Sequence, residues 1–117
     1  MSDKSGQQPI PTHWRQTFRE VVKAFAADDY RPEIPGVEPL SADTATQVQH
    51  YIRDYGATLV ALPEETWGSS VCMWAGDHWE ALIDLWTQEE GRSDLVLHAK
   101  VTDEPRFSVR VHLVYVP

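Results

Sequence analysis

The segment Leu82–Leu97, LIDLWTQEEGRSDLVL, consists of two apolar runs separated by a short acidic turn with a glycine. The connection from Gln88 to Arg92 is typical of a β-hairpin, because glycine supplies the backbone conformation that closes a tight turn. A hairpin provides each strand with a neighbour, so this segment commits the chain to an antiparallel sheet. The pattern does not indicate an activity, and the 117 residues contain no recognisable catalytic, metal-binding or nucleotide-binding motif.

The rest of the C-terminal half also has the character of strands. We expect strands at Val71–Trp74, Trp79–Thr87, Ser93–Val101 and Phe107–Val116. The second segment also fits a helix, because four of its apolar residues recur at helical spacing. We favour the strand, since a helix there would leave Ser93–Val101 without its hairpin partner.

The N-terminal half favours two helices. The first runs from a Thr12 N-cap to Ala27, and Ser41 and Gly56 mark the ends of the second. Their predicted buried faces are Trp14, Phe18, Val21, Val22 and Phe25 in the first helix and Ala45, Val48, Ile52 and Tyr55 in the second. Three prolines between the helices make Tyr30–Leu40 a loop.

Two short segments connect the second helix to the sheet: Thr58–Leu62 as a short strand and Glu64–Gly68 as a turn or a single helical turn. Residues 1–10 are expected to be a disordered tail. Residues 11–117 are then predicted to form one α+β domain, with two N-terminal helices packed on a mainly antiparallel, curved meander of four to five strands.

The composition limits the cellular compartment and the classes of binding partner that are expected. The single cysteine, Cys72, forbids an intrachain disulfide, suits a reducing cytoplasm, and is expected as a small buried side chain. The N-terminus lacks the apolar segment of a signal peptide, and no apolar run is long enough to span a bilayer. A net charge of -8 disfavours binding to nucleic acid, because the phosphate backbone is also negatively charged. We expect no membrane, cofactor or metal.

Pairing the last two strands predicts which side chains share a face. With Val101 opposite Phe107, the following pairs are Ala99 with Val109, Leu97 with Val111, and Leu95 with Leu113, beside Ile83 and Leu85. That side is predicted to be core. The opposite side collects Leu82, Asp84, Trp86, Asp94, Val96, His98, Lys100, Ser108, Arg110, His112 and Val114. It is too apolar for a solvated face, so a protein partner or a second copy is expected there.

The same side contains the residues closest to an acid–base site. His98 is expected opposite Arg110, with His112 diagonal to it and carboxylates at Asp84 and Asp94. A His–carboxylate pair can move protons, yet cross-strand charge pairing explains the same residues, and we favour that structural reading. The metal-ligand types nearby are His78, Glu80 and His98. H-x-E without a downstream cysteine pair is no zinc signature, so no metal is expected.

The turn carries the most distinctive local motif: Glu89, Glu90, Gly91, Arg92, Ser93 and Asp94. Its expected role is structural, because Ser and Asp side chains bond backbone donors and Arg92 can pair with Glu89 or Glu90. Ligand binding by this loop is the alternative.

Four tryptophans fall within twenty residues: Trp67, Trp74, Trp79 and Trp86. We expect Trp74 and Trp79 in the core. For Trp86 an interface role and packing are both open, since tryptophan is enriched at binding hot spots.

Two families resemble parts of this chain. The run Leu85–Leu95, with Asp54-Tyr55-Gly56 and Leu59–Pro63 upstream, resembles a family of small uncharacterised bacterial domains in which L-W-T-x-E-E-G-R-S-D-L recurs. That likeness spans about Phe18 to Val116 and implies no activity. The element order, with Val22–Tyr30 similar to a helix-end A-x-G-D signature, resembles the nuclear-transport-factor-2-like (SnoaL-type) superfamily. This second resemblance implies a cone between helices and sheet for a small apolar ligand.

Two functional hypotheses follow. The first is a non-enzymatic, immunity-like protein-interaction module whose outer sheet face, with Trp86, engages a protein. The second is a small-molecule-binding or enzymatic member of the nuclear-transport-factor-2-like superfamily. A filled core favours the first hypothesis, and a deep closed cone favours the second.

Overall fold

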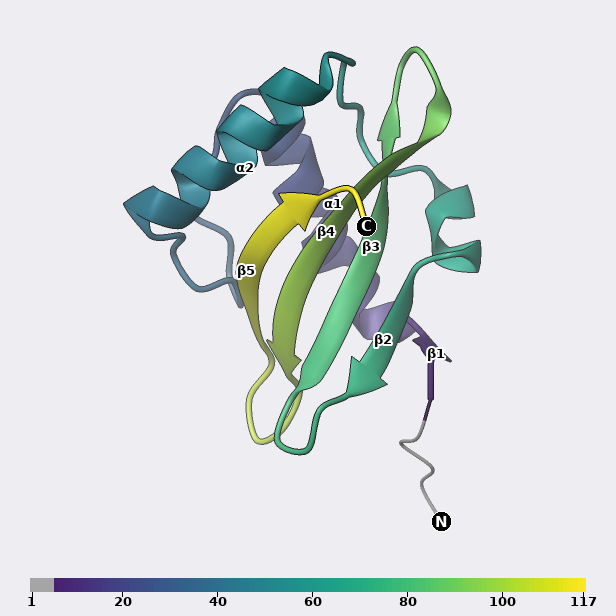
Figure 1. Ribbon diagram of the computed structural model, residues 1–117. Helices are drawn as coiled ribbons and strands as arrows, with labels where there is room; N and C mark the ends of the chain where they lie inside the picture. Colours follow the sequence, from purple (N-terminus) through teal and green to yellow (C-terminus); the bar gives the residue numbers. More distant parts are fainter. Residues whose placement is uncertain (1–5) are drawn as a thin grey trace.

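An antiparallel sheet forms the centre of the computed structural model, which describes residues 6–117 (Figure 1). The elements are β1 (Gln8–Pro9), α1 (Thr12–Ala26), α2 (Ala42–Tyr55), the 3-10 helix η1 (Glu64–Gly68), β2 (Val71–Trp74), β3 (Trp79–Thr87), β4 (Gly91–Thr102) and β5 (Ser108–Tyr115). The strands lie in chain order, and every neighbouring pair is antiparallel. In Figure 1, α1 lies behind the sheet and α2 lies beside β5. The predicted α+β architecture is confirmed.

The β3–β4 hairpin is present, and the strand assignment of Trp79–Thr87 is confirmed. Gly91 has a φ of 75°, in the left-handed region that residues with a Cβ rarely adopt. Strand β4 begins at this glycine and runs to Thr102, so it is longer than the predicted Ser93–Val101. Strand β5 is one residue shorter at each end than predicted.

Helix α1 buries its predicted stripe, Trp14, Phe18, Val21, Val22 and Phe25. Its predicted boundaries are each wrong by one residue. Pro11, with a φ of -54°, takes the N-cap position, so Thr12 already lies inside the helix and no side chain caps it. The helix ends at Ala26, and Ala27 is the C-cap.

Both predicted ends of α2 are confirmed. The Ser41 hydroxyl accepts a hydrogen bond from the backbone N–H of Thr44 at 3.1 Å, which satisfies a donor that the first turn leaves free. Gly56 ends the helix with a φ of 84°. The buried side chains are Ala45, Val48 and Ile52, while Tyr55 is half-buried.

The β4–β5 pairing is shifted by two residues from the prediction. Val101 lies opposite Val109, and Ala99 lies opposite Val111. Phe107 belongs to the turn rather than to β5, which begins at Ser108. Because side chains alternate with a period of two, this shift leaves each of these residues on its predicted face.

A β-bulge then changes the faces of the last residues. The register moves by one between His98 and Ala99, so that His98 pairs with Leu113 and His112 is the extra residue. An extra residue exchanges the two faces of everything that follows it. Val114, predicted on the outer face, is therefore fully buried, and Leu113, predicted as core, lies half-buried on the outer face.

The prediction of a disordered tail over residues 1–10 is wrong for its last residues. Gln8 and Pro9 pair with Cys72 and Val71, and Ile10 is fully buried. Residues 1–5 lie outside the described residues. Cys72 is buried as predicted, its thiol donates to the Pro9 carbonyl at 3.6 Å, and burial raises its pKa to about 11.

The connection from α2 to β2 agrees only in part with the prediction. Thr58–Leu62 is no continuous strand, although Leu59 forms an isolated bridge to Thr87. The segment follows the end of β3, since the Val60 N–H donates to the Trp86 carbonyl at 3.0 Å. Glu64–Gly68 is the single helical turn expected there.

The inner face of the sheet and α1 share one core. Fully buried side chains on the strands include Ile83, Leu85, Leu97 and Val101, and they belong to the same cluster as Phe18 of α1. Dense packing of this kind fills the space between helix and sheet. No helix among the described residues is long and apolar enough to cross a membrane.

The tryptophans divide between the core and its edge. Trp67 is buried, whereas Trp74 and Trp79, expected in the core, are half-buried and meet edge to face with ring centroids 5.2 Å apart. Trp79 also meets Trp14 of α1 at 6.1 Å. The pair therefore closes one end of the core.

Candidate functional site

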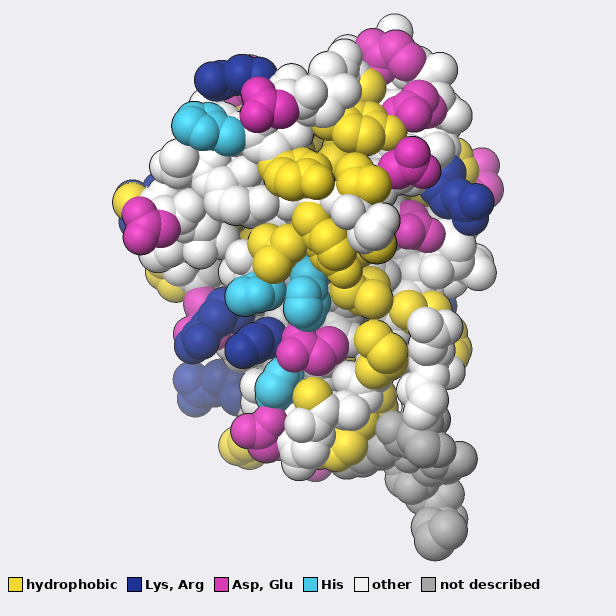
Figure 2. Space-filling view, viewed as in Figure 1, with side chains coloured by type: hydrophobic (Ala, Val, Ile, Leu, Met, Phe, Trp, Pro, Cys, Tyr) yellow, Lys and Arg dark blue, Asp and Glu magenta, His cyan; other side chains and the backbone are white. Residues whose placement is uncertain are grey.

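The outer face of the sheet, opposite α1, is the surface that the described helices leave uncovered (Figure 1). The strand register arranges the side chains at its centre in three rows: Met73, Glu80, Lys100 and Arg110; Val71, Leu82, His98 and Leu113; and Asp84, Val96 and Tyr115. We call these residues the outer face. Figure 2 looks onto this side of the molecule, and hydrophobic side chains gather across its middle beside two histidines.

Apolar side chains dominate the second and third rows of the outer face. Val96 is 8% exposed, and Leu82, Leu113 and Tyr115 are half-buried. Each contributes little surface alone, but their neighbouring positions make the apolar area continuous. The first row adds a charged strip along one side of this area.

Several residues predicted for interaction do lie on the outer face: Leu82, Val96, His98 and Arg110. His112, at the bulge, is exposed beside them. Trp86 follows Leu82 and Asp84 on the same side of β3, as predicted, but it is half-buried and packs against the core, with its ring 3.7 Å from the position that a Cβ on Gly91 would occupy. Val114 is core, as described above, so it is removed from the candidate site.

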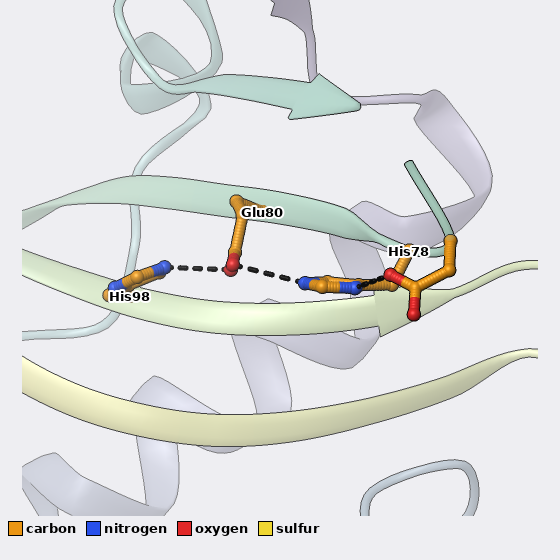
Figure 3. Close-up of polar contacts among 4 residues, drawn as sticks. His78, Glu80 and His98 are labelled. Atoms are coloured by element: carbon orange, nitrogen blue, oxygen red, sulfur yellow. Dashed lines mark hydrogen bonds and ion pairs between the residues drawn. The ribbon is translucent and has the colours of Figure 1, made fainter. Parts of the chain in front are cut away.

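Glu80 connects two histidines on this face (Figure 3). Its Oε1 lies 3.0 Å from Nε2 of His78, and its Oε2 lies 2.8 Å from Nε2 of His98. Nδ1 of His78 contacts Asp77. The ring of His98 meets that of His112 edge to face at 5.1 Å. A polar chain thus runs from the β2–β3 turn across to β5.

These contacts shift the ionisation of two members of the chain. Hydrogen bonds to Glu80 and then to Asp77 raise the pKa of His78 above its ordinary value. Partial burial acts to raise the pKa of Glu80, but hydrogen bonds from His78 and His98 outweigh it and hold this pKa below its ordinary value. Mutual stabilisation of opposite charges accounts for both directions.

The partners of the predicted acid–base residues differ from expectation. His98 contacts Glu80 rather than Asp84 or Asp94, and it lies opposite Leu113 rather than Arg110. The sequence did not single out Glu80 for this role because its pairing depends on the β3–β4 register.

Arg110 lies opposite Lys100 and binds the Glu38 carboxylate at 3.0 and 3.3 Å. This ion pair raises the pKa of the guanidinium. Arg110 is thus anchored to the loop before α2, and it is not a partner of His98.

The structure does bring together His78, Glu80 and His98, the residue types considered for a metal. Both carboxylate oxygens of Glu80 are engaged with imidazole nitrogens. Within residues 6–117, no group of three or more His, Cys, Asp or Glu side chains has an arrangement that could hold a metal ion. The contacts are those of a surface ion-pair chain.

A hollow of about 360 Å³ lies beside His78, lined by Trp74, Asp77, His78, Trp79, Thr102, Asp103 and Glu104. Glu80 and His98 do not line it. A proton-transfer site needs its acid–base pair within reach of an enclosed substrate. The Glu80–His98 pair therefore lies outside this hollow.

The acidic residues of the turn motif hold the hairpin to α2 and its following loop. Glu89 accepts hydrogen bonds from the Thr58 backbone N–H at 2.8 Å and from the Thr58 hydroxyl at 2.9 Å. Glu90 accepts from the Tyr55 hydroxyl at 3.0 Å and from the Thr87 hydroxyl at 3.1 Å. The expected pairing with Arg92 is replaced by these contacts.

The Ser93 hydroxyl forms hydrogen bonds at a second irregularity in the sheet, which lies between β3 and β4. Between the pairs Asp84–Val96 and Trp86–Arg92, the residues 93–95 of β4 face Leu85 alone. The Ser93 hydroxyl donates to the Leu85 carbonyl at 2.7 Å and accepts from the Leu95 N–H at 3.1 Å. The Asp94 N–H donates to the Tyr55 hydroxyl at 3.2 Å. These contacts of Glu89, Glu90, Ser93 and Asp94 connect the hairpin to β3, to α2 and to the loop after it, and we call these four residues the clamp.

Comparison with known families gives one match. A family model described as a domain of unknown function, DUF7668, matches residues 22–117, which is more than half of the chain. The chain belongs to the DUF7668 family. Neither the curated proteins nor the solved structures contain a significant match.

The DUF7668 region contains α2, the strands β2 to β5 and the turn motif, so the outer face and the clamp both belong to the family domain. Strand β1 and the first part of α1 precede it. The match supports the expected family of small uncharacterised domains. It gives no support to the nuclear-transport-factor-2-like resemblance.

Proposed function

We propose that this DUF7668 domain is a non-enzymatic docking module that binds a protein through its outer face. The observation that supports the proposal is the apolar area of Leu82, Val96, Leu113 and Tyr115, over which no described helix lies. A solvated sheet face normally alternates toward polar side chains, whereas an apolar area with a charged border is typical of a protein-binding surface.

The core weighs against the small-molecule alternative. That alternative needs a cone between the helices and the sheet, yet Phe18, Ile83 and Leu97 are all 0% exposed there and belong to one packed cluster. A hollow of about 740 Å³ is lined by residues of the loop 31–39 and not by residues of the space between α1 and the sheet. Surface docking is the reading that the packing supports.

An immunity-like role would use acidic surface to bind a basic partner. The outer face carries two carboxylates, Glu80 and Asp84, and two permanent cations, Lys100 and Arg110. The excess acid of the chain therefore lies elsewhere, and the outer face favours a partner without strong charge.

A photo-crosslinking residue at position 82 tests the proposal in cells that express this protein naturally. Position 20 is the matched control, because Glu20 is exposed on α1, on the opposite side of the sheet. We expect a protein adduct from position 82 that position 20 does not give. It should be lost when Leu113→Glu places a charge in the apolar area. Absence of any adduct from position 82, in a variant whose circular dichroism matches the wild type, would contradict the docking function.

A further inference from the structure

We infer that the protein on the outer face is a second copy of this chain, packed face to face about a two-fold axis parallel to the strands. The inference rests on the proposed docking function and names its partner. It follows from the edges of the sheet, from the charge of the face and from the order of charges across the strands.

The edges of the sheet are closed, so copies cannot easily join by extending it. Along β5, the Glu38 N–H donates to the Val109 carbonyl at 2.8 Å, and the Val109 N–H donates to the Gly36 carbonyl at 2.7 Å. At the other edge, β1 has only two residues, and one of them is Pro9, which has no N–H. The outer face is thus the part of the sheet left for association.

The charge of the outer face suits a copy of itself. Glu80 and Asp84 share the face with Lys100, while the charge of Arg110 is matched by Glu38, so the face carries a net charge of only -1 with neutral histidines, although the whole chain carries -8. A strongly basic partner would gain little at such a face, and a strongly acidic one would be repelled by the rest of the chain. A partner with the same nearly balanced pattern meets neither problem.

The order of charges selects one axis. A two-fold axis along the strands, between β3 and β4, lays β3 of one copy over β4 of the other while keeping each row over itself. Glu80 then lies over Lys100 of the second copy, and the contact occurs twice because the interface is symmetric. An axis perpendicular to the strands would instead bring Glu80 over Asp84 of the second copy, two like charges.

Lys100 provides the free half of this contact. It is half-buried in the first row, and within the described residues its ammonium group has no hydrogen-bond or ion-pair partner. Glu80 already contacts His78 and His98. A carboxylate has about four acceptor positions, so it can still accept from a lysine above it.

The size of the face sets the strength of the dimer. Four strands about 4.8 Å apart and three rows about 7 Å apart give roughly 400 Å² on each copy, or roughly 800 Å² of interface in total. Specific interfaces of about this size lie at the weak end of the range, so we expect a dissociation constant on the order of micromolar. The sheets would pack about 10 Å apart with their strands roughly aligned.

Sedimentation velocity over about 5–500 µM protein tests the inference, with Glu80→Lys and Lys100→Glu as paired variants. Each variant places like charges at both Glu80–Lys100 contacts, so each alone should be monomeric where the wild type is dimeric. An equimolar mixture should form a heterodimer, because the reversed charges then meet their opposites. Each substitution changes the net charge of -8 by two units, so both variants remain acidic and general attraction between them is excluded.

The outcomes separate this inference from the docking function. Dimers of the wild type and of the mixture, but not of either variant alone, support the two-fold arrangement. A wild type that stays monomeric throughout this range, or a mixture that stays monomeric, overturns it. If the adduct from position 82 then contains a different protein, the docking function stands and only the second copy is wrong. If there is no adduct either, both fail.

Discussion

Gln47 of α2 forms both backbone hydrogen bonds of Val114 that a further strand would supply. Its Nε2 donates to the Val114 carbonyl at 2.7 Å, and its Oε1 accepts from the Val114 N–H at 3.2 Å. A side-chain amide carries the same donor and acceptor as a peptide group. The helix thereby protects the end of β5, and Tyr51 continues the protection by accepting from the Val116 N–H at 3.1 Å.

Replacement of Gln47 by glutamate should destabilise the protein by about 1–3 kcal/mol, because the carboxylate cannot donate to the Val114 carbonyl. Urea unfolding followed by circular dichroism measures the loss. Gln49→Glu is the control, since it makes the same chemical change on α2 without a hydrogen bond to β5 among the described residues. Equal stability of the two variants would show that the contact adds nothing.

Gly91→Val should lower stability by about 1–3 kcal/mol, because valine is strained at a φ of 75°. Gly91→Asn is the matched variant, since asparagine tolerates the left-handed conformation better than other residues. The added Cβ meets the Trp86 ring at 3.7 Å, an ordinary contact, so backbone strain is the main expected term. A thermal midpoint of the valine variant no lower than that of the asparagine variant would contradict this origin.

Ser93→Ala should cost about 1–3 kcal/mol, because it leaves the buried Leu85 carbonyl and Leu95 N–H without their shared partner. Ser108→Ala is the control, because it removes a half-buried hydroxyl from β5 that lies away from the irregularity between β3 and β4. Hydrogen exchange of the Leu95 amide gives a local readout. The exchange rate of this amide should rise in Ser93→Ala. An unchanged rate would mean that the hydroxyl does not stabilise the irregularity between β3 and β4.

The stability that His78 contributes should depend on pH. Its pKa is raised in the folded state above the ordinary 6.5, so its contribution is complete below 6.5 and disappears as the pH rises through the folded value. Glu80 acts oppositely: its pKa lies below the ordinary 4.5, so its contribution is present above 4.5 and is lost as the pH falls through the folded value.

We therefore expect the wild type to exceed His78→Gln in unfolding free energy at pH 6 and the difference to shrink toward pH 8.5. Chemical denaturation at several pH values measures it. His50→Gln, on the exposed side of α2, controls for the loss of a surface imidazole. A difference that stays constant over this range would contradict the ion-pair chain.

Local signals account for the parts of the fold that could be predicted. The turn glycine, alternating strands, and the Ser41 and Gly56 caps each act within a few residues, so they can be read from the chain directly. The bulge at His112 has no such signal, since it depends on how β5 fits β4 and α2. That single residue decided which of Leu113 and Val114 reached the surface.

The candidate site was predictable to the same extent. Leu82, Val96 and His98 were placed correctly because alternation assigns faces within one strand. The partner of His98 was not, because Glu80 lies on another strand and the contact depends on register. The contacts of Glu89 and Glu90 were missed for a similar reason, since Tyr55 and Thr58 are more than thirty residues distant in sequence.

Because Cys72 is the single cysteine of the chain, its rate of chemical modification reports how often the structure around it opens. The Cys72 side chain is 1% exposed, contacts the Pro9 carbonyl, and is almost entirely protonated at neutral pH. A thiol reagent can therefore modify it only after β1 has separated from β2 or the chain has unfolded. Labelling rates at increasing denaturant would distinguish these two events, because release of two residues exposes much less surface than global unfolding. The rate at which β1 separates from β2 can thus be measured with the natural cysteine, without adding another labelling site.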